Sequence, residues 1–117
     1  MSQDKHSPPR TAIFSQWPRD FRLLAVAVFG VGGIGLSAIQ GARFAGARQI
    51  IAVDLVESKL DIAREFGATD GVDASRTDPV EVIQDISGGG VDYAFEAIGN
   101  AKVAVQCVES LGLGGTS

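Results

Sequence analysis

The sequence has 117 residues, which suits one domain of ordinary size. Its 10 basic and 14 acidic residues give a net charge of −4, so nucleic acid is not an expected partner. One cysteine and one histidine are too few for a disulfide or a four-ligand zinc site. The longest apolar run, residues 23–29, is far shorter than the ~20 residues of a membrane helix. We therefore expect a cytoplasmic globular protein without a membrane partner or a protein-built metal site.

Residues 1–22 differ in character from the rest of the chain. They contain three prolines, mixed charges and no sustained apolar period, so residues 1–10 are expected to form a disordered tail. Phe14, Trp17 and Phe21 leave two alternatives open. The segment is either an unstructured leader or an arm that folds back over an apolar surface. The domain itself is expected over residues 23–117.

From residue 24 onward, short apolar runs alternate with helical patterns. A continuously apolar run such as residues 24–29 is typical of a strand that is buried on both faces. Asp78, followed by Pro79, predicts one helix start, and Asn100 predicts another. The full prediction places strands at 24–29, 49–54, 71–74 and 91–98, and helices at 34–45, at 57–66, after Asp78 and after Asn100.

This alternation predicts an α/β fold: a partial doubly wound parallel sheet of about four strands, truncated before the last strands. Residues 114–117 are interpreted as a turn that leads toward a further strand. In the order 3-2-1-4, the strand at 91–98 would lie at an open edge. Free N–H and C=O groups there would favour self-association or pairing with another chain.

The main functional signal is the motif G-x-G-x-x-G, at Gly30, Gly32 and Gly35, between the first strand and the first helix. Gly30 is expected to make the tight turn, and Gly35 to let the helix pack close to the strand. Gly32 lacks a Cβ, so a pyrophosphate can approach the backbone. The amides of Gly33 and Ile34 would then bind that anion at the helix N-terminus.

Four further residues are predicted to complete a cofactor site. Asp54 closes the second strand 19 residues after Gly35, close to the usual spacing of about 20. Its carboxylate would accept hydrogen bonds from the adenosine ribose and repel a 2′-phosphate, so the expected cofactor is NAD and not NADP. Lys59 lies within reach of the same ribose. Ile98 and Gly99 close the fourth strand and should flank the cofactor.

Other reactive side chains are interpreted as structural. Asp92 and Glu96 fall on one face of a strand, but solvated or helix-paired carboxylates are more typical there than a catalytic pair. Cys107 falls on the apolar face of the last helix and is expected to pack in the core. No catalytic residue is predicted in this chain.

Residues 25–115 resemble the coenzyme-binding domain of medium-chain, zinc-dependent alcohol dehydrogenases. The resemblance rests on VAVFGVGGIGLSAIQGARFAGARQIIAVD, KLDIAREFGATDGVD, GGVDYAFEAIGN and LGLGG. It implies NAD contacts by the glycine loop, Asp54 and Lys59, and hydride transfer between NAD and an alcohol or a hydroxymethyl-thiol adduct in the parent family. The family's zinc ligands and proton-relay residues are not found in these 117 residues.

The leading hypothesis is therefore an NAD-binding fragment of such an oxidoreductase, inactive alone. One alternative is a non-catalytic fragment that pairs with a full-length dehydrogenase. Another is a small S-adenosylmethionine-binding methyltransferase, which also has a glycine-rich first turn and an acidic end to its second strand. The third glycine of the motif argues against this last alternative.

Overall fold

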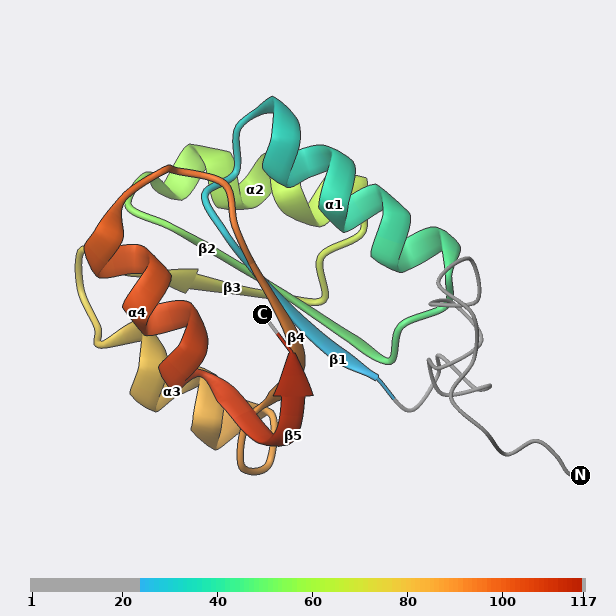
Figure 1. The fold of residues 1–117 in the computed structure, drawn as a ribbon. Coiled ribbons are helices and arrows are strands. Elements are labelled where there is room, and N and C mark those ends of the chain that lie inside the picture. Colours follow the sequence, from blue (N-terminus) through green and yellow to red (C-terminus); the bar gives the residue numbers. More distant parts are fainter. Residues whose placement is uncertain (1–23, 117) are drawn as a thin grey trace, which may run out of the picture.

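The computed structural model describes residues 24–116, which form a parallel sheet between two layers of helices (Figure 1). The predicted tail and the arm with Phe14, Trp17 and Phe21 lie outside the described residues. The α/β alternation that the sequence predicts is confirmed. The strands are β1 (Ala25–Phe29), β2 (Gln49–Asp54), β3 (Asp70–Asp73), β4 (Val91–Glu96) and β5 (Leu111–Thr116), and the helices are α1 (Gly33–Phe44), α2 (Glu57–Phe66), α3 (Pro79–Ile86) and α4 (Ala101–Glu109).

The strand order is β3-β2-β1-β4-β5, and every neighbouring pair is parallel. The chain moves outward from β1 to β3, crosses back to β4 and continues to β5. Because parallel crossovers share one hand, this reversal of direction puts α1 and α2 on one face and α3 and α4 on the other. Figure 1 shows the two helical layers on opposite sides of the sheet. The doubly wound prediction is confirmed.

The expected open edge at residues 91–98 is wrong, because β4 is paired on both sides. It pairs with β1 and, through a local irregularity in register, with β5. The predicted turn at residues 114–117 largely belongs to this fifth strand. Glycines are weak strand formers, and those at 112, 114 and 115 conceal β5 in the sequence. An added Cβ on Gly90 would lie 2.4 Å from the backbone nitrogen of Gly112, so two backbones touch where β5 begins.

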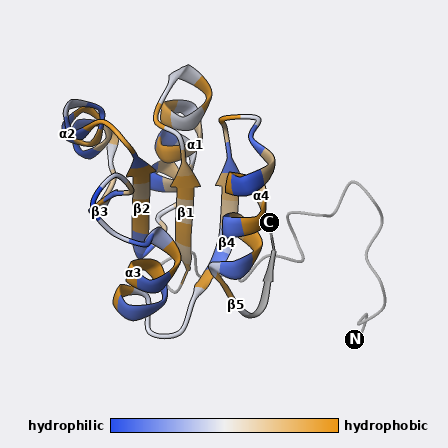
Figure 2. Ribbon diagram, turned by 90° about the vertical axis from the view of Figure 1, so that its left-hand side faces the viewer, coloured by the Kyte–Doolittle hydropathy of each residue, from blue (hydrophilic) through white to orange (hydrophobic). Residues whose placement is uncertain are grey.

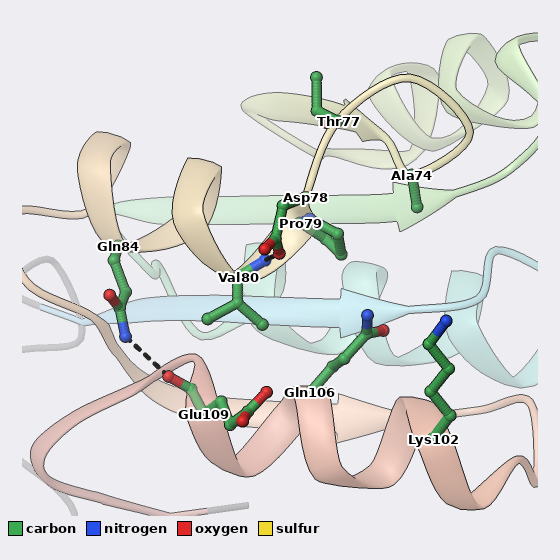
Figure 3. Close-up of a pocket in the computed structure, with 9 residues that line it drawn as sticks. All are labelled: Ala74, Thr77, Asp78, Pro79, Val80, Gln84, Lys102, Gln106 and Glu109. Carbon is green, nitrogen blue, oxygen red and sulfur yellow. Dashed lines mark hydrogen bonds between the residues drawn. The ribbon is translucent and has the colours of Figure 1, made fainter.

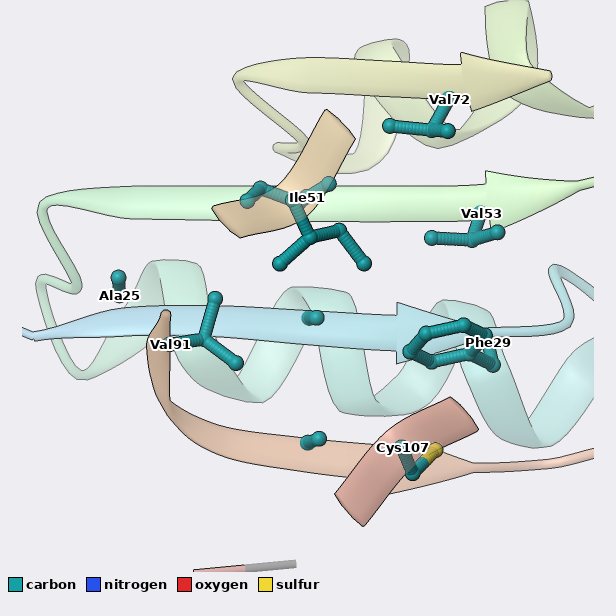
Figure 4. Packing of buried hydrophobic residues seen from close by; sticks show 10 residues of the cluster. Ala25, Phe29, Ile51, Val53, Val72, Val91 and Cys107 are labelled. Carbon is teal, nitrogen blue, oxygen red and sulfur yellow. The ribbon is translucent and has the colours of Figure 1, made fainter. Parts of the chain in front are cut away.

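Apolar side chains fill both faces of the sheet. All five residues of β1 are buried, as a strand covered on both sides requires. Figure 2 shows the strands as the most hydrophobic layer, with hydrophilic residues on the outer sides of the helices. The cluster on the α3 and α4 face includes the residues labelled in Figure 4: Ala25, Phe29, Ile51, Val53, Val72, Val91 and Cys107.

Cys107 belongs to this core, as predicted, and its side chain is 2% exposed. Burial, reinforced by the negative charge of Glu96, raises the pKa of the thiol to about 11. The thiol therefore stays protonated at neutral pH and acts as a small apolar group.

The two predicted helix caps are present. The Asp78 carboxylate accepts a hydrogen bond from the amide of Val80, and the Asn100 side chain accepts bonds from the amides of Lys102 and Val103. Other boundaries shift slightly. The first helix begins at Gly33, β3 spans Asp70–Asp73, and β4 ends at Glu96. The last shift matters for the site, because Ile98 and Gly99 lie in a turn and not in the strand.

Candidate dinucleotide-binding site

The predicted site residues meet at the carboxyl ends of β1, β2 and β4. In an open parallel sheet, ligands bind where the strand order reverses, which here is between β1 and β4. The glycine loop follows β1, and Asp54 is the last residue of β2. The turn of residues 97–100 follows β4. Lys59 is exposed in the first turn of α2, at the same edge of the sheet.

Two glycines of the loop are required by the fold itself. Gly30 has a φ of +98° and donates its N–H to the carbonyl of Val53 at 2.8 Å. An added Cβ there would lie 2.6 Å from Cγ1 of Ile98. An added Cβ on Gly35 would lie 1.8 Å from the carbonyl oxygen of Gly30, because α1 packs directly on the turn. The sharp turn and the close helix approach therefore both need glycine.

Gly32 and Gly33 have a different environment, because both are exposed and no atom lies within 4 Å of an added Cβ. Gly32 is the N-cap of α1, and no side chain caps this helix. The first turn of a helix has N–H groups without intrahelical acceptors, and the helix dipole adds positive potential there. Open space beside the amides of Gly33 and Ile34 therefore fits a phosphate group.

Asp54 connects two loops of the site. Its Oδ2 accepts a hydrogen bond from the amide of Val31 at 2.9 Å, and its Oδ1 accepts one from the amide of Val56 at 3.0 Å. Each carboxylate oxygen has a further lone pair, so these bonds leave acceptor capacity for ribose hydroxyls. The sequence reasoning missed this positioning role. Spacing alone did not indicate that the carboxylate of residue 54 contacts the amide of residue 31.

Glu96 holds the turn after β4. Its Oε2 accepts hydrogen bonds from the amides of Ile98 at 2.5 Å, of Gly99, and of Asn100 at 3.3 Å. Gly99 has a φ of +77°, a conformation that favours glycine. This arrangement keeps Ile98 against Gly30, so the turn after β4 forms one wall of the glycine loop.

Asp92 and Glu96 do not form an acid–base pair. The carboxylate of Asp92 accepts the amide of Ala25 at 2.8 Å, at the amino end of β1, whereas Glu96 lies at the carboxyl end of β4. Partial burial by itself would raise the pKa of Glu96, but its three backbone hydrogen bonds outweigh that effect and lower the pKa below its usual range. Each carboxylate thus stabilises backbone groups in its charged form.

We expect the contribution of Glu96 to stability to depend on pH. Because its pKa is lower in the folded state, Glu96 stabilises the fold above the unfolded value of about 4.3. That stabilisation is lost as the pH falls through the folded value. In urea unfolding, Glu96→Gln should be less stable than wild type at pH 7, and the difference should shrink in acid. Glu109→Gln, on an exposed position of α4, is the control. An equal difference at both pH values would contradict the assignment.

A separate hollow of about 750 Å³ lies between α3 and α4 (Figure 3). Its lining includes Asp78, Gln84 and Lys102, and Gln84 donates to the carbonyl of Glu109 at 2.8 Å. None of the predicted site residues lines it. Within residues 24–116, no group of three or more His, Cys, Asp or Glu side chains is placed to hold a metal ion. No helix in this part of the chain is long and apolar enough to cross a membrane.

A glycine turn at the point where the strand order reverses is characteristic of Rossmann-type dinucleotide-binding domains, and residues 24–116 have that architecture. The family model for zinc-binding dehydrogenases matches residues 33–117, and the chain belongs to that family. The resemblance noted in the sequence is thereby confirmed. Family membership favours the dehydrogenase interpretation over the methyltransferase alternative.

The chain is similar to known dehydrogenases over most of its length. S-(hydroxymethyl)glutathione dehydrogenase of Escherichia coli O139:H28 is 49% identical over 88 residues, or 74% of this chain and 24% of the relative. The structure of an alcohol dehydrogenase zinc-binding domain protein from Burkholderia ambifaria has a TM-score of 0.75 at 47% identity, covering 76% of this chain and 24% of that one. A Sinorhizobium meliloti 1021 structure bound to NADP has a TM-score of 0.76 at 39% identity, covering 79% and 28%. The chain thus spans about a quarter of the length of its relatives.

Proposed function

We propose that this chain binds the adenosine and pyrophosphate parts of NAD and is the coenzyme-binding part of an alcohol dehydrogenase-like oxidoreductase. The observation that carries the proposal is the open space beside Gly32 and Gly33, at the uncapped N-terminus of α1. A pyrophosphate fits there because backbone N–H donors and the helix dipole favour an anion. The parent reaction would oxidise an alcohol or a hydroxymethyl-thiol adduct.

Each residue has a separate role in this proposal. The amides of Gly33 and Ile34 bind the pyrophosphate, while Gly30 and Gly35 hold the turn in shape. Asp54 accepts hydrogen bonds from the ribose hydroxyls, and its contact with Val31 keeps the ribose and pyrophosphate subsites in register. When bound, the nicotinamide of NAD would supply the hydride acceptor.

Two further groups complete the proposed site. Lys59 contacts the ribose from the first turn of α2. Ile98 and Gly99 flank the cofactor from the turn after β4, which Glu96 holds in place.

The choice of NAD over NADP rests on the charge of Asp54. A carboxylate beside the ribose repels a 2′-phosphate, whereas NADP sites present an arginine nearby. The residue that follows Asp54 is Leu55, which is exposed. One structural neighbour binds NADP, so the family accommodates both cofactors, and we infer the preference of this chain from Asp54 alone.

The test is to compare Asp54→Asn with Asp73→Asn by calorimetric titration of NAD and NADP. Asp73 is a matched control because it closes β3 as Asp54 closes β2, and it too accepts hydrogen bonds in its own turn. Asp54→Asn should weaken NAD binding by about 1–3 kcal/mol, through loss of charge-assisted hydrogen bonds. Its preference for NAD over NADP should also narrow.

Asp73→Asn should leave both affinities unchanged. A loop that is merely loosened would weaken NAD and NADP equally, so the ratio of the two affinities distinguishes the ribose role from a structural one. Unchanged NAD affinity in Asp54→Asn would contradict the site. The alternative of a fragment that pairs with a full-length dehydrogenase stays a prediction, which co-purification tests.

A further inference from the structure

An apolar groove of about 670 Å³ lies on the α1 face of the sheet, beside β4. We call it the β4 groove. Its walls include Leu24 and Val26 at the start of the sheet, Ala42 and Phe44 on α1, and Phe95 on β4. The side chain of Phe44 is 95% exposed and that of Phe95 is 43% exposed. Contiguous apolar surface of this kind marks a site of interaction.

The β4 groove follows from the strand order. Because the chain reverses direction after β3, its later helices α3 and α4 pack on the opposite face from α1 and α2 (Figure 1). On the α1 face, the described helices therefore cover β1, β2 and β3 but leave β4 partly open. This face needs a further element that none of residues 24–116 supplies.

We propose that residues 1–23 of the same chain occupy the β4 groove, with Phe14, Trp17 and Phe21 as the contacting side chains. The chain reaches the groove directly, because Leu24 lines it and residue 23 is the next residue toward the N-terminus. Trp17 is seven residues from Leu24, a reach of up to ~25 Å. Helix α1, whose last residue is Phe44, has 12 residues and is therefore only ~18 Å long.

Charge also favours this occupant. Residues 1–23 carry four basic and two acidic residues, whereas residues 24–117 carry six basic and twelve acidic residues. The segment is thus net positive and the rest of the chain is net negative. Attachment adds a further advantage over a second copy, because a short tether holds the segment at an effective concentration in the millimolar range.

Trp17 is the only tryptophan of the chain, so its fluorescence reports the position of this segment. In the full chain, its emission should be blue-shifted relative to the urea-unfolded chain, and acrylamide should quench it several-fold less. Phe44→Ser/Phe95→Ser should move both values toward those of the unfolded chain. Val105→Ser/Val108→Ser is the matched control, because these side chains are 56% and 59% exposed on α4, the helix on the other face. It should leave both values unchanged.

Circular dichroism confirms that each variant is folded. Single Phe44→Ser is a second variant for the case that the double change unfolds the domain, since so exposed a side chain contributes little packing. A Trp17 emission equal to that of the unfolded chain would overturn the proposal. A blue shift that disappears on dilution would also overturn it, because a second copy would then be the occupant.

Discussion

Gly35→Ala should destabilise the domain more than any other single methyl addition in the glycine loop. The added Cβ would lie 1.8 Å from the carbonyl oxygen of Gly30 and 2.9 Å from its carbonyl carbon. Both are backbone atoms, so α1 must move away from the turn as a whole. Overpacking costs typically 1–3 kcal/mol, and we expect a cost of about 3 kcal/mol or more here. This is a large fraction of the ~5–15 kcal/mol that stabilises most domains.

Gly41→Ala is the matched control in the same helix. Gly41 is exposed, and an added Cβ meets no atom within 4 Å. Alanine should therefore stabilise the domain by about 0.5–1 kcal/mol, because glycine is a poor residue in a helix interior. Urea unfolding followed by circular dichroism measures both changes. Equal stabilities of Gly35→Ala and wild type would show that α1 does not pack on the turn as described.

Gly32→Val should have the opposite profile, with little change in stability and a loss of NAD binding. Gly32 has φ −95° and ψ −160°, which other residues adopt, and open space surrounds its Cβ position. The valine side chain would occupy the volume that we assign to the pyrophosphate. We expect NAD affinity to fall by roughly 100-fold or more, which corresponds to about 2.7 kcal/mol.

The measurement is calorimetric titration of NAD, combined with urea unfolding of the same preparation. Gly41→Val is the control, because it adds the same side chain to α1 at a distance from the loop. It should bind NAD like wild type. If Gly32→Val also binds NAD like wild type, the phosphate does not approach this glycine, and the proposed site is wrong.

Local sequence patterns predicted much of the fold. Continuous apolar runs indicated β1 and β2, since a strand that is covered on both faces has no polar side to show. Asp78 and Asn100 indicated two helix starts through their preference for the N-cap. The spacing of Gly30, Gly32 and Gly35 predicted a turn between strand and helix, with Asp54 at the end of the neighbouring strand. Each signal lies within a few residues or follows a known spacing.

The sequence by itself therefore determined the order of most elements, the doubly wound topology and the edge of the sheet where the candidate site lies. Only the tertiary structure decided the rest. β5 was hidden because its glycines allow the close approach of β5 to Gly90, which local propensity does not report. The bond from Asp54 to Val31 and the three amides held by Glu96 were likewise not predicted. The β4 groove depends on which face each crossover helix covers, and that follows from the path of the whole chain.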